Sequence, residues 1–141
     1  MAALPDVLGG VRVIGRNTAD PDNMIERVRA GLPYKALDSL AKTLELSPAE
    51  TSRIFSIPQR TLMRRKSSHR LTADESDRVL RVARVVAHAI DTLEGREAAV
   101  GWIKSPNPAL GRKTPLSMLD TDLGTREVER ILGRIDHGVF S

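Results

Sequence analysis

The stretch Ser47–Lys66, which reads SPAETSRIFSIPQRTLMRRK, decides the fold predicted for this chain. Ser47 and Glu50 form the start signal of one helix, because a serine cap followed three residues later by glutamate closes a capping box. Pro58 opens a second helix after a short turn, because proline fits the first position of a helix. Two short helices joined in this way are typical of a helix-turn-helix.

Small and apolar residues support this motif at the positions where its two helices must meet. Ser52 is small midway along the first helix, where the second helix crosses closely. The residues that would hold the helices together are apolar: Phe55, Ile57 and Leu62. Two positions depart from the usual pattern, because Ser56 replaces the glycine that commonly opens the turn and Arg65 replaces an apolar residue. A plain helical hairpin with a solvated basic face therefore stays open as an alternative.

Positive charge is concentrated on the second helix of this motif. Between Pro58 and Leu71 the chain holds five Lys or Arg residues and no acid, whereas residues 1–33 hold four basic and four acidic residues. An acid-free basic stretch favours phosphate binding, and Arg and Gln suit bidentate contacts with base edges in the major groove. We therefore predict a DNA-contacting set on and just after this helix: Gln59, Arg60, Thr61, Arg64, Arg65, Lys66, Ser67 and Arg70.

Signals for helix starts and helix ends predict an all-α chain. The longest helix begins at a second capping box, formed by Thr72 and Glu75, and ends before Gly95. No alternating β-branched run with a hairpin signal is present. Residues 1–20 lack a clear period, so we expect a loose arm there, with one short ordered piece at Val11–Ile14. The expected helices cover residues 21–30, 33–44, 47–55, 58–66, 72–94, 96–104 and 125–137.

Several kinds of catalytic and metal site find no support in the sequence. The chain has no cysteine, which excludes disulfides, thiolate nucleophiles and thiolate metal ligands. Its three histidines are dispersed, and no pair has the spacing of helical metal ligands. Asp136 and His137 lie near Ser141 in the sequence, as in a catalytic triad, but a chain terminus cannot hold a serine nucleophile rigidly. We therefore expect no enzymatic activity, no metal site and no cofactor.

Length and hydropathy indicate a small cytoplasmic protein without a membrane partner. The chain has 141 residues and a net charge of +4, which suits one compact domain or two very small ones. No apolar run approaches the roughly 20 residues of a membrane span. The apolar start of the chain lacks a basic segment and is broken by Pro5 and Asp6, so it is a poor signal peptide.

Short motifs in the second half of the chain form a more specific set than the basic helix. They are Trp102, the loop Asn107–Gly111 (NPALG), Pro115-Leu116, Leu119–Thr121, Gly124 and the run Ile135–Gly138 (IDHG). Together with Arg60–Leu62 and Arg64–Lys66, they strongly resemble antitoxins of the Xre/MbcA/ParS type, the partners of RES-domain toxins in bacterial type II toxin–antitoxin pairs. The resemblance covers about residues 31–141, and residues 1–30 match least.

This resemblance implies an Xre-like helix-turn-helix DNA-binding domain followed by a small helical toxin-binding domain. Such an antitoxin dimerises, covers the active site of its toxin and represses its own operon by binding operator DNA. The NAD chemistry of a RES-domain toxin would belong to that partner. We therefore expect an arm at residues 1–20, a DNA-binding domain at 21–71 and a dimerisation and toxin-binding domain at 72–141. The expected toxin-binding residues are Trp102, Asn107, Leu110, Gly111, Asp136, His137, Gly138, Val139, Phe140 and Ser141.

Two surfaces carry further expectations. Phe140, one of only four aromatic residues, lies near the end of the sequence, where it either packs on the chain's own core or enters a cleft of the toxin. The apolar faces of the helix at 72–94 and of the last two helices exceed what so small a domain hides easily, so we expect a homodimer. A stand-alone dimeric transcriptional regulator without a toxin stays open, as does an interaction module without a DNA role.

Overall fold

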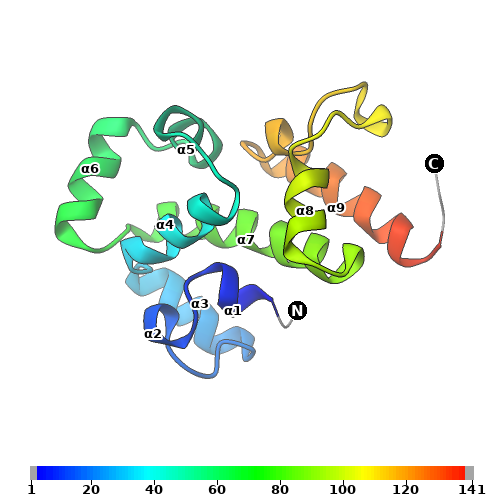
Figure 1. Ribbon diagram of the computed structural model, residues 1–141. Coiled ribbons are helices and arrows are strands. Elements are labelled where there is room, and N and C mark those ends of the chain that lie inside the picture. The colour runs from blue at the N-terminus through cyan, green and yellow to red at the C-terminus, as the bar shows by residue number, and fades with distance from the viewer. Residues whose placement is uncertain (1–2, 139–141) are drawn as a thin grey trace.

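The computed structural model describes residues 3–138, which form helices joined by loops and short turns (Figure 1). Two isolated β-bridges, Pro33 with Arg70 and Asn107 with Lys113, form no sheet within this range. The prediction of an all-α chain is confirmed. The helices are α1 (Leu4–Val7), α2 (Val11–Ile14), α3 (Pro21–Ala30), α4 (Tyr34–Thr43), α5 (Pro48–Phe55), α6 (Gln59–Ser68), α7 (Ala73–Leu93), α8 (Arg96–Ile103), the 3₁₀ turns η1 (Pro108–Leu110) and η2 (Leu116–Met118), and α9 (Asp122–Asp136).

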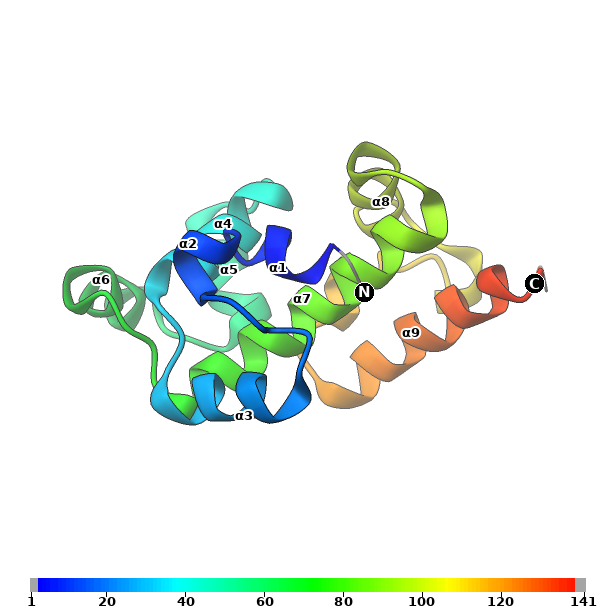
Figure 2. The ribbon, with the colours of Figure 1, turned by 90° about the horizontal axis from the view of Figure 1, so that it is seen from below.

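Helix α7 is the axis of the fold, and helices from both halves of the chain pack on it (Figure 1, Figure 2). It contacts α1, α3, α4 and α5 from the first half and α8 and α9 from the second. Its apolar face is buried within the chain by these contacts: Val79, Val82, Ala83, Val85, Val86 and Ala89. The expectation that this face is left exposed is therefore wrong, and the homodimer stays a prediction without that support.

The expectation of a loose arm over residues 1–20 is wrong for α1 at Leu4–Val7, whereas the short ordered piece expected at Val11–Ile14 is present as α2. Helices α1 and α2 bury Val7, Leu8 and Ile14, and α1 packs against both α4 and α7. Each of these helices has only four residues, which is too short to be stable alone or to show a helical period. Their order comes from burial against the rest of the chain.

Side-chain caps place most helix starts where the sequence predicts them. The carboxylate of Asp20 accepts the N–H of Asp22 at the start of α3, and the capping boxes of α5 and α7 are both complete. Helix α9 begins three residues before the predicted start, because Thr121 caps it by accepting the N–H of Gly124. A Cβ on Gly124 would collide with the carbonyl oxygen of Met118, so glycine allows η2 to pack on the first turn of α9.

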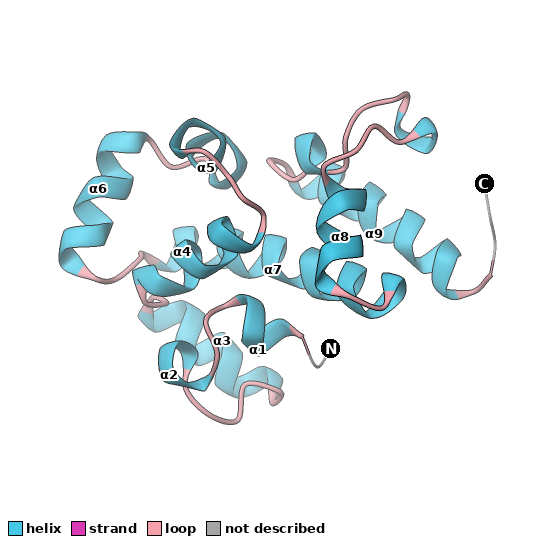
Figure 3. Ribbon diagram, viewed as in Figure 1, coloured by secondary structure: helices cyan, strands magenta, loops and turns pink. Residues whose placement is uncertain are grey.

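The basic helix and the last helix lie at opposite ends of the molecule. Helix α6 occupies one end and the C-terminal end of α9 the other in both views (Figure 1, Figure 2). Between α8 and α9 the chain is mostly loop, interrupted by η1 and η2 (Figure 3). The fold therefore separates two surfaces that the sequence assigns to different partners.

Candidate functional site

Helix α6 presents most of the predicted DNA-contacting residues to solvent. Thr61 is half-buried and accepts a hydrogen bond from Nη2 of Arg64 at 3.3 Å. No acidic residue interrupts the helix, so its exposed face attracts polyanions. Six residues of the predicted set are exposed, five on the helix and Arg70 just after it: Gln59, Arg60, Arg64, Lys66, Ser67 and Arg70.

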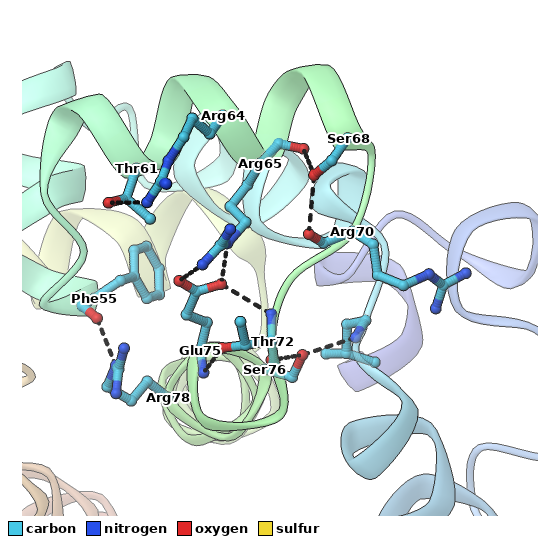
Figure 4. Close-up of polar contacts among 11 residues, drawn as sticks. Phe55, Thr61, Arg64, Arg65, Ser68, Arg70, Thr72, Glu75, Ser76 and Arg78 are labelled. Atoms are coloured by element: carbon cyan, nitrogen blue, oxygen red, sulfur yellow. Dashed lines mark hydrogen bonds and ion pairs between the residues drawn. The ribbon is translucent and has the colours of Figure 1, made fainter.

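Arg65 points away from this face and toward α7 (Figure 4). Its Nε donates to Oε1 of Glu75 at 2.7 Å, and its Nη2 donates to Oε2 at 3.1 Å. Arg65 therefore fills the position where an apolar residue commonly packs in this motif, and it does so as half of an ion pair. Because this bidentate contact takes up Nε and Nη2 of Arg65, DNA would have to share the guanidinium with Glu75.

Glu75 joins this ion pair to the start of α7. The residue is only 5% exposed, and its Oε1 also accepts the N–H of Thr72 at 2.9 Å. Burial raises the pKa of the Glu75 carboxyl, but the hydrogen bonds from Arg65 and Thr72 outweigh burial and leave the pKa below its usual value. The charged carboxylate thus fixes α6 against the first turn of α7.

Two more side chains of α7 hold α5 and the segment before α4 (Figure 4). Nε of Arg78 donates to the carbonyl oxygen of Phe55, the last residue of α5, at 2.8 Å. Oγ of Ser76 accepts the N–H of Leu32 at 2.7 Å, in the segment before α4. The first two turns of α7 therefore set the position of both helices of the helix-turn-helix.

Arg70, which the sequence assigns to phosphate, is bound within the chain. Its Nη1 donates to the carbonyl oxygen of Gly31 at 2.5 Å, beside the bridge between Pro33 and Arg70. Gly31 has a φ of 94°, and a Cβ there would collide with the carbonyl oxygen of Leu71. This close approach ties the end of α6 to the start of α4, and a phosphate would have to share Arg70 with Gly31.

The predicted toxin-binding residues between α8 and α9 shape a loop. Trp102 and Leu110 are half-buried and pack against the core. The side-chain oxygen of Asn107 accepts the N–H of Ala109 at 2.9 Å, and Gly111 follows with a φ of 64°. Asn107 therefore stabilises the loop, whereas Gly111 lies on its exposed surface.

Asp136 fastens the end of α9 to α7. Its Oδ2 contacts Nε2 of His88 at 2.6 Å, and its Oδ1 accepts a hydrogen bond from Oγ1 of Thr92 at 2.5 Å. The hydrogen bonds from Thr92 and then His88 hold the pKa of the Asp136 carboxyl below its usual value. No local pattern marks His88 and Thr92, because they lie 48 and 44 residues from Asp136 in the sequence.

The predicted C-terminal toxin contacts divide into two groups. Nδ1 of His137 lies 2.9 Å from the carbonyl oxygen of Gly133, and Gly138 is exposed with a φ of 72°. Val139, Phe140 and Ser141 lie outside the described residues.

Within residues 3–138, no helix is both long and apolar enough to cross a membrane, and no group of three His, Asp or Glu side chains could hold a metal ion.

Comparisons with known proteins identify two domains. Residues 24–84 match the family model of the antitoxin Xre-like helix-turn-helix domain, and residues 88–138 match that of the antitoxin Xre/MbcA/ParS C-terminal toxin-binding domain. The chain is 34% identical over 132 residues to Antitoxin Xre of Yersinia enterocolitica, covering 92% of this chain and 89% of the relative. The chain belongs to the Xre antitoxin family. The resemblance predicted from its motifs is thereby confirmed, and the two matched ranges of this antitoxin meet within α7.

Other relatives agree with this membership. Antitoxin Xre of Photorhabdus laumondii is 36% identical over 132 residues, which cover 92% of this antitoxin and 89% of the relative. A Sphingobium protein named Prs ADP-ribosylating antitoxin is 26% identical over 133 residues, covering 87% and 84% of the two chains. A chain of the crystal structure of the Mycobacterium tuberculosis MbcT–MbcA toxin–antitoxin complex shares the fold, with a TM-score of 0.54 and 20% identity over 77% of this antitoxin and 96% of that chain.

Proposed function

We propose that this antitoxin neutralises a RES-domain toxin by covering the toxin's active site, and that it represses its own operon by binding operator DNA through α6. One observation above all supports the DNA half. Arg60, Arg64 and Lys66 stand exposed on an acid-free helix at one end of the molecule. The matched C-terminal domain supports the toxin half.

The class of toxin is inferred from the family. The matched domain is named after Xre, MbcA and ParS antitoxins, and its range, 88–138, includes the motifs around Trp102, the loop 107–111 and the end of α9. The resemblance implies a partner that consumes NAD or transfers ADP-ribose from it. The antitoxin's role is then to exclude the substrate of that partner.

The arrangement of the two surfaces supports simultaneous binding of both partners. Helix α6 and the C-terminal end of α9 lie at opposite ends of the molecule (Figure 1, Figure 2). A toxin bound at α8, α9 and the residues that follow would leave α6 open to DNA. The toxin–antitoxin complex itself can therefore act as the repressor.

Neutralisation is tested by co-expressing the antitoxin with the toxin encoded by the adjacent gene. The full chain should protect growth and the cellular NAD pool, and deletion of residues 138–141 should restore toxicity and NAD loss. Arg64→Ala, which changes only the opposite end of the molecule, should protect like the wild type. A truncated chain that still protects at matched expression would move inhibition to the surface around Trp102 and residues 107–111.

Operator binding is tested by gel shift on the promoter of the antitoxin's own operon at several salt concentrations. Arg64→Ala should lower the slope of log affinity against log salt by about 0.9 for each bound chain, because each phosphate contact releases about one counterion. Arg134→Ala removes an exposed arginine of α9 and should leave the slope unchanged. Equal slopes for both variants and the wild type would exclude α6 as the DNA-contacting helix. Binding of DNA with no co-purifying toxin would favour the stand-alone regulator.

The proposed homodimer gives each antitoxin pair two copies of α6, one for each half-site of a two-fold operator. Light scattering of the free antitoxin should then report about twice 15.5 kDa. A strict monomer, both alone and on operator DNA, would contradict two-fold operator recognition.

A further inference from the structure

Met63 is an apolar side chain exposed in the middle of α6. It is 72% exposed, and it is the only large hydrophobic residue of α6 that is exposed. Across residues 3–138, few large hydrophobic side chains are this exposed: Val11, Ile25, Met63 and Leu123. A single exposed apolar residue is ordinary on most surfaces, so the meaning of Met63 depends on where it lies.

The helical period places Met63 at the centre of the face proposed to contact DNA. Residues three and four apart share a face of a helix, so Met63 lies beside Arg60 and Ser67 on the exposed side of α6. Arg64 flanks it along the chain, and all three neighbours are exposed. The helix therefore presents one apolar contact framed by polar and positive ones.

The base edges of the major groove offer one apolar group to such a side chain. Thymine carries a C5-methyl group there, the one methyl group among the base edges, and the bases are otherwise read through hydrogen-bond donors and acceptors. An unbranched thioether adapts readily to the shape of its contact. We propose that Met63 determines part of the operator specificity by contacting the C5-methyl group of a thymine. This inference rests on the proposed binding of operator DNA by α6.

Charge favours DNA over a protein as the partner of Met63. Five Lys or Arg residues and no acid lie between Pro58 and Leu71, so the surroundings of Met63 attract a polyanion. Met63 also lines a groove with Leu46 and Pro48, on the side of α6 that faces α4 and α5. A protein segment in that groove is the competing occupant, and the experiment must distinguish it from DNA.

The test replaces each thymine of the operator singly with uracil, which removes only the C5-methyl group. Wild-type antitoxin should lose about four-fold in affinity at the contacted thymine, the effect of burying one methyl group. Met63→Ala should bind the thymine operator about four-fold or more weakly and show no further loss with uracil at that position. Met63→Leu, which keeps an apolar side chain, should keep the sensitivity to uracil.

Leu123→Ala is the matched control, because Leu123 is 76% exposed and lies at the start of α9. It should keep both the wild-type affinity and the sensitivity to uracil. An unchanged thermal melting curve should confirm that Met63→Ala is folded, as expected for an exposed side chain.

Four outcomes would overturn the inference. If uracil lowers the affinity of the wild type and of Met63→Ala equally, the methyl contact belongs to another residue. If no uracil substitution lowers the affinity of the wild type, there is no such contact. Met63→Ala that binds DNA normally but no longer protects cells from the toxin would place Met63 in the protein interface. A wild type that binds no fragment of its own promoter would overturn the proposed DNA binding as well.

Discussion

Glu75→Ala tests whether the buried ion pair between α6 and α7 stabilises the helix-turn-helix. The carboxylate accepts three hydrogen bonds, two from Arg65 and one from the N–H of Thr72. A typical buried hydrogen bond contributes about 1 kcal/mol net, and more when one group is charged. Loss of the Glu75 carboxylate should therefore lower the free energy of unfolding by about 3 kcal/mol.

Thermal denaturation followed by far-ultraviolet circular dichroism measures this loss. The entropy of unfolding of a chain of this length is about 0.3 kcal/mol per degree. A loss of about 3 kcal/mol should then lower Tm by about 10 °C. Because α6 is held by this contact, operator affinity of Glu75→Ala should also fall at temperatures where the variant is folded, while its salt slope stays that of the wild type.

Glu50→Ala is the matched control. Glu50 occupies the equivalent position in the capping box of α5, where it accepts the N–H of Ser47, and it forms no ion pair among the described residues. Its removal should lower Tm much less than Glu75→Ala. Equal falls in Tm for the two variants would refute the idea that the ion pair contributes more than the capping box.

The pH dependence of Glu75 gives the same contact a second signature. The pKa of Glu75 in the folded protein lies below the ordinary value of 4.5, so the folded state favours the carboxylate. Its stabilisation is then complete above that ordinary value and is lost as pH falls through the lowered pKa. The difference in Tm between wild type and Glu75→Ala should shrink in acid, and a constant difference would contradict the assigned pKa direction.

Two further predictions concern α9. Gly124→Ala should destabilise the chain in thermal denaturation, because its Cβ would collide with the backbone of η2, whereas Gly133→Ala in the same helix meets open space and should stabilise by about 0.5–1 kcal/mol. Similar effects of the two variants would contradict the close packing at Gly124. An NMR titration should give the Asp136 carboxyl a pKa below the ordinary aspartate value of 3.8. Its contact with α7 is then kept above that pH and is lost as the pH falls through the lowered pKa. A pKa at the ordinary value would contradict the contact.

Much of the fold could be predicted from the sequence because helix starts are encoded locally. The capping boxes at Ser47 and Thr72 and the Asp20 cap each use residues within three positions of one another, so the sequence itself displays them. Helices α1 and α2 lack such signals and depend on burial of residues such as Leu8 against distant helices. The start of α9 was predicted too late, because its first turn contains Gly124, a residue that weakens a helix but that the packing of η2 requires.

The candidate site could also be predicted only in part. The basic character of α6 is visible in the sequence, and residues such as Arg60 and Arg64 stand exposed where the pattern predicts them. The sequence also marks Arg65 as unusual for a packing position, but only the structure shows its partner, Glu75, ten residues away. Met63 was not among the predicted DNA contacts, because that set contains only polar and positively charged side chains and Met63 is apolar.

The position of the family boundary inside α7 makes the length of one helix a determinant of geometry. A helix turns about 100° and advances about 1.5 Å per residue. One residue inserted near Ala87, between the two matched domains, would swing the toxin-binding end about 100° around the axis of α7 relative to α6. About seven inserted residues would restore the direction and add about 10 Å of separation. An insertion or deletion in α7 would therefore change the angle between a bound toxin and the operator in steps of about 100° per residue.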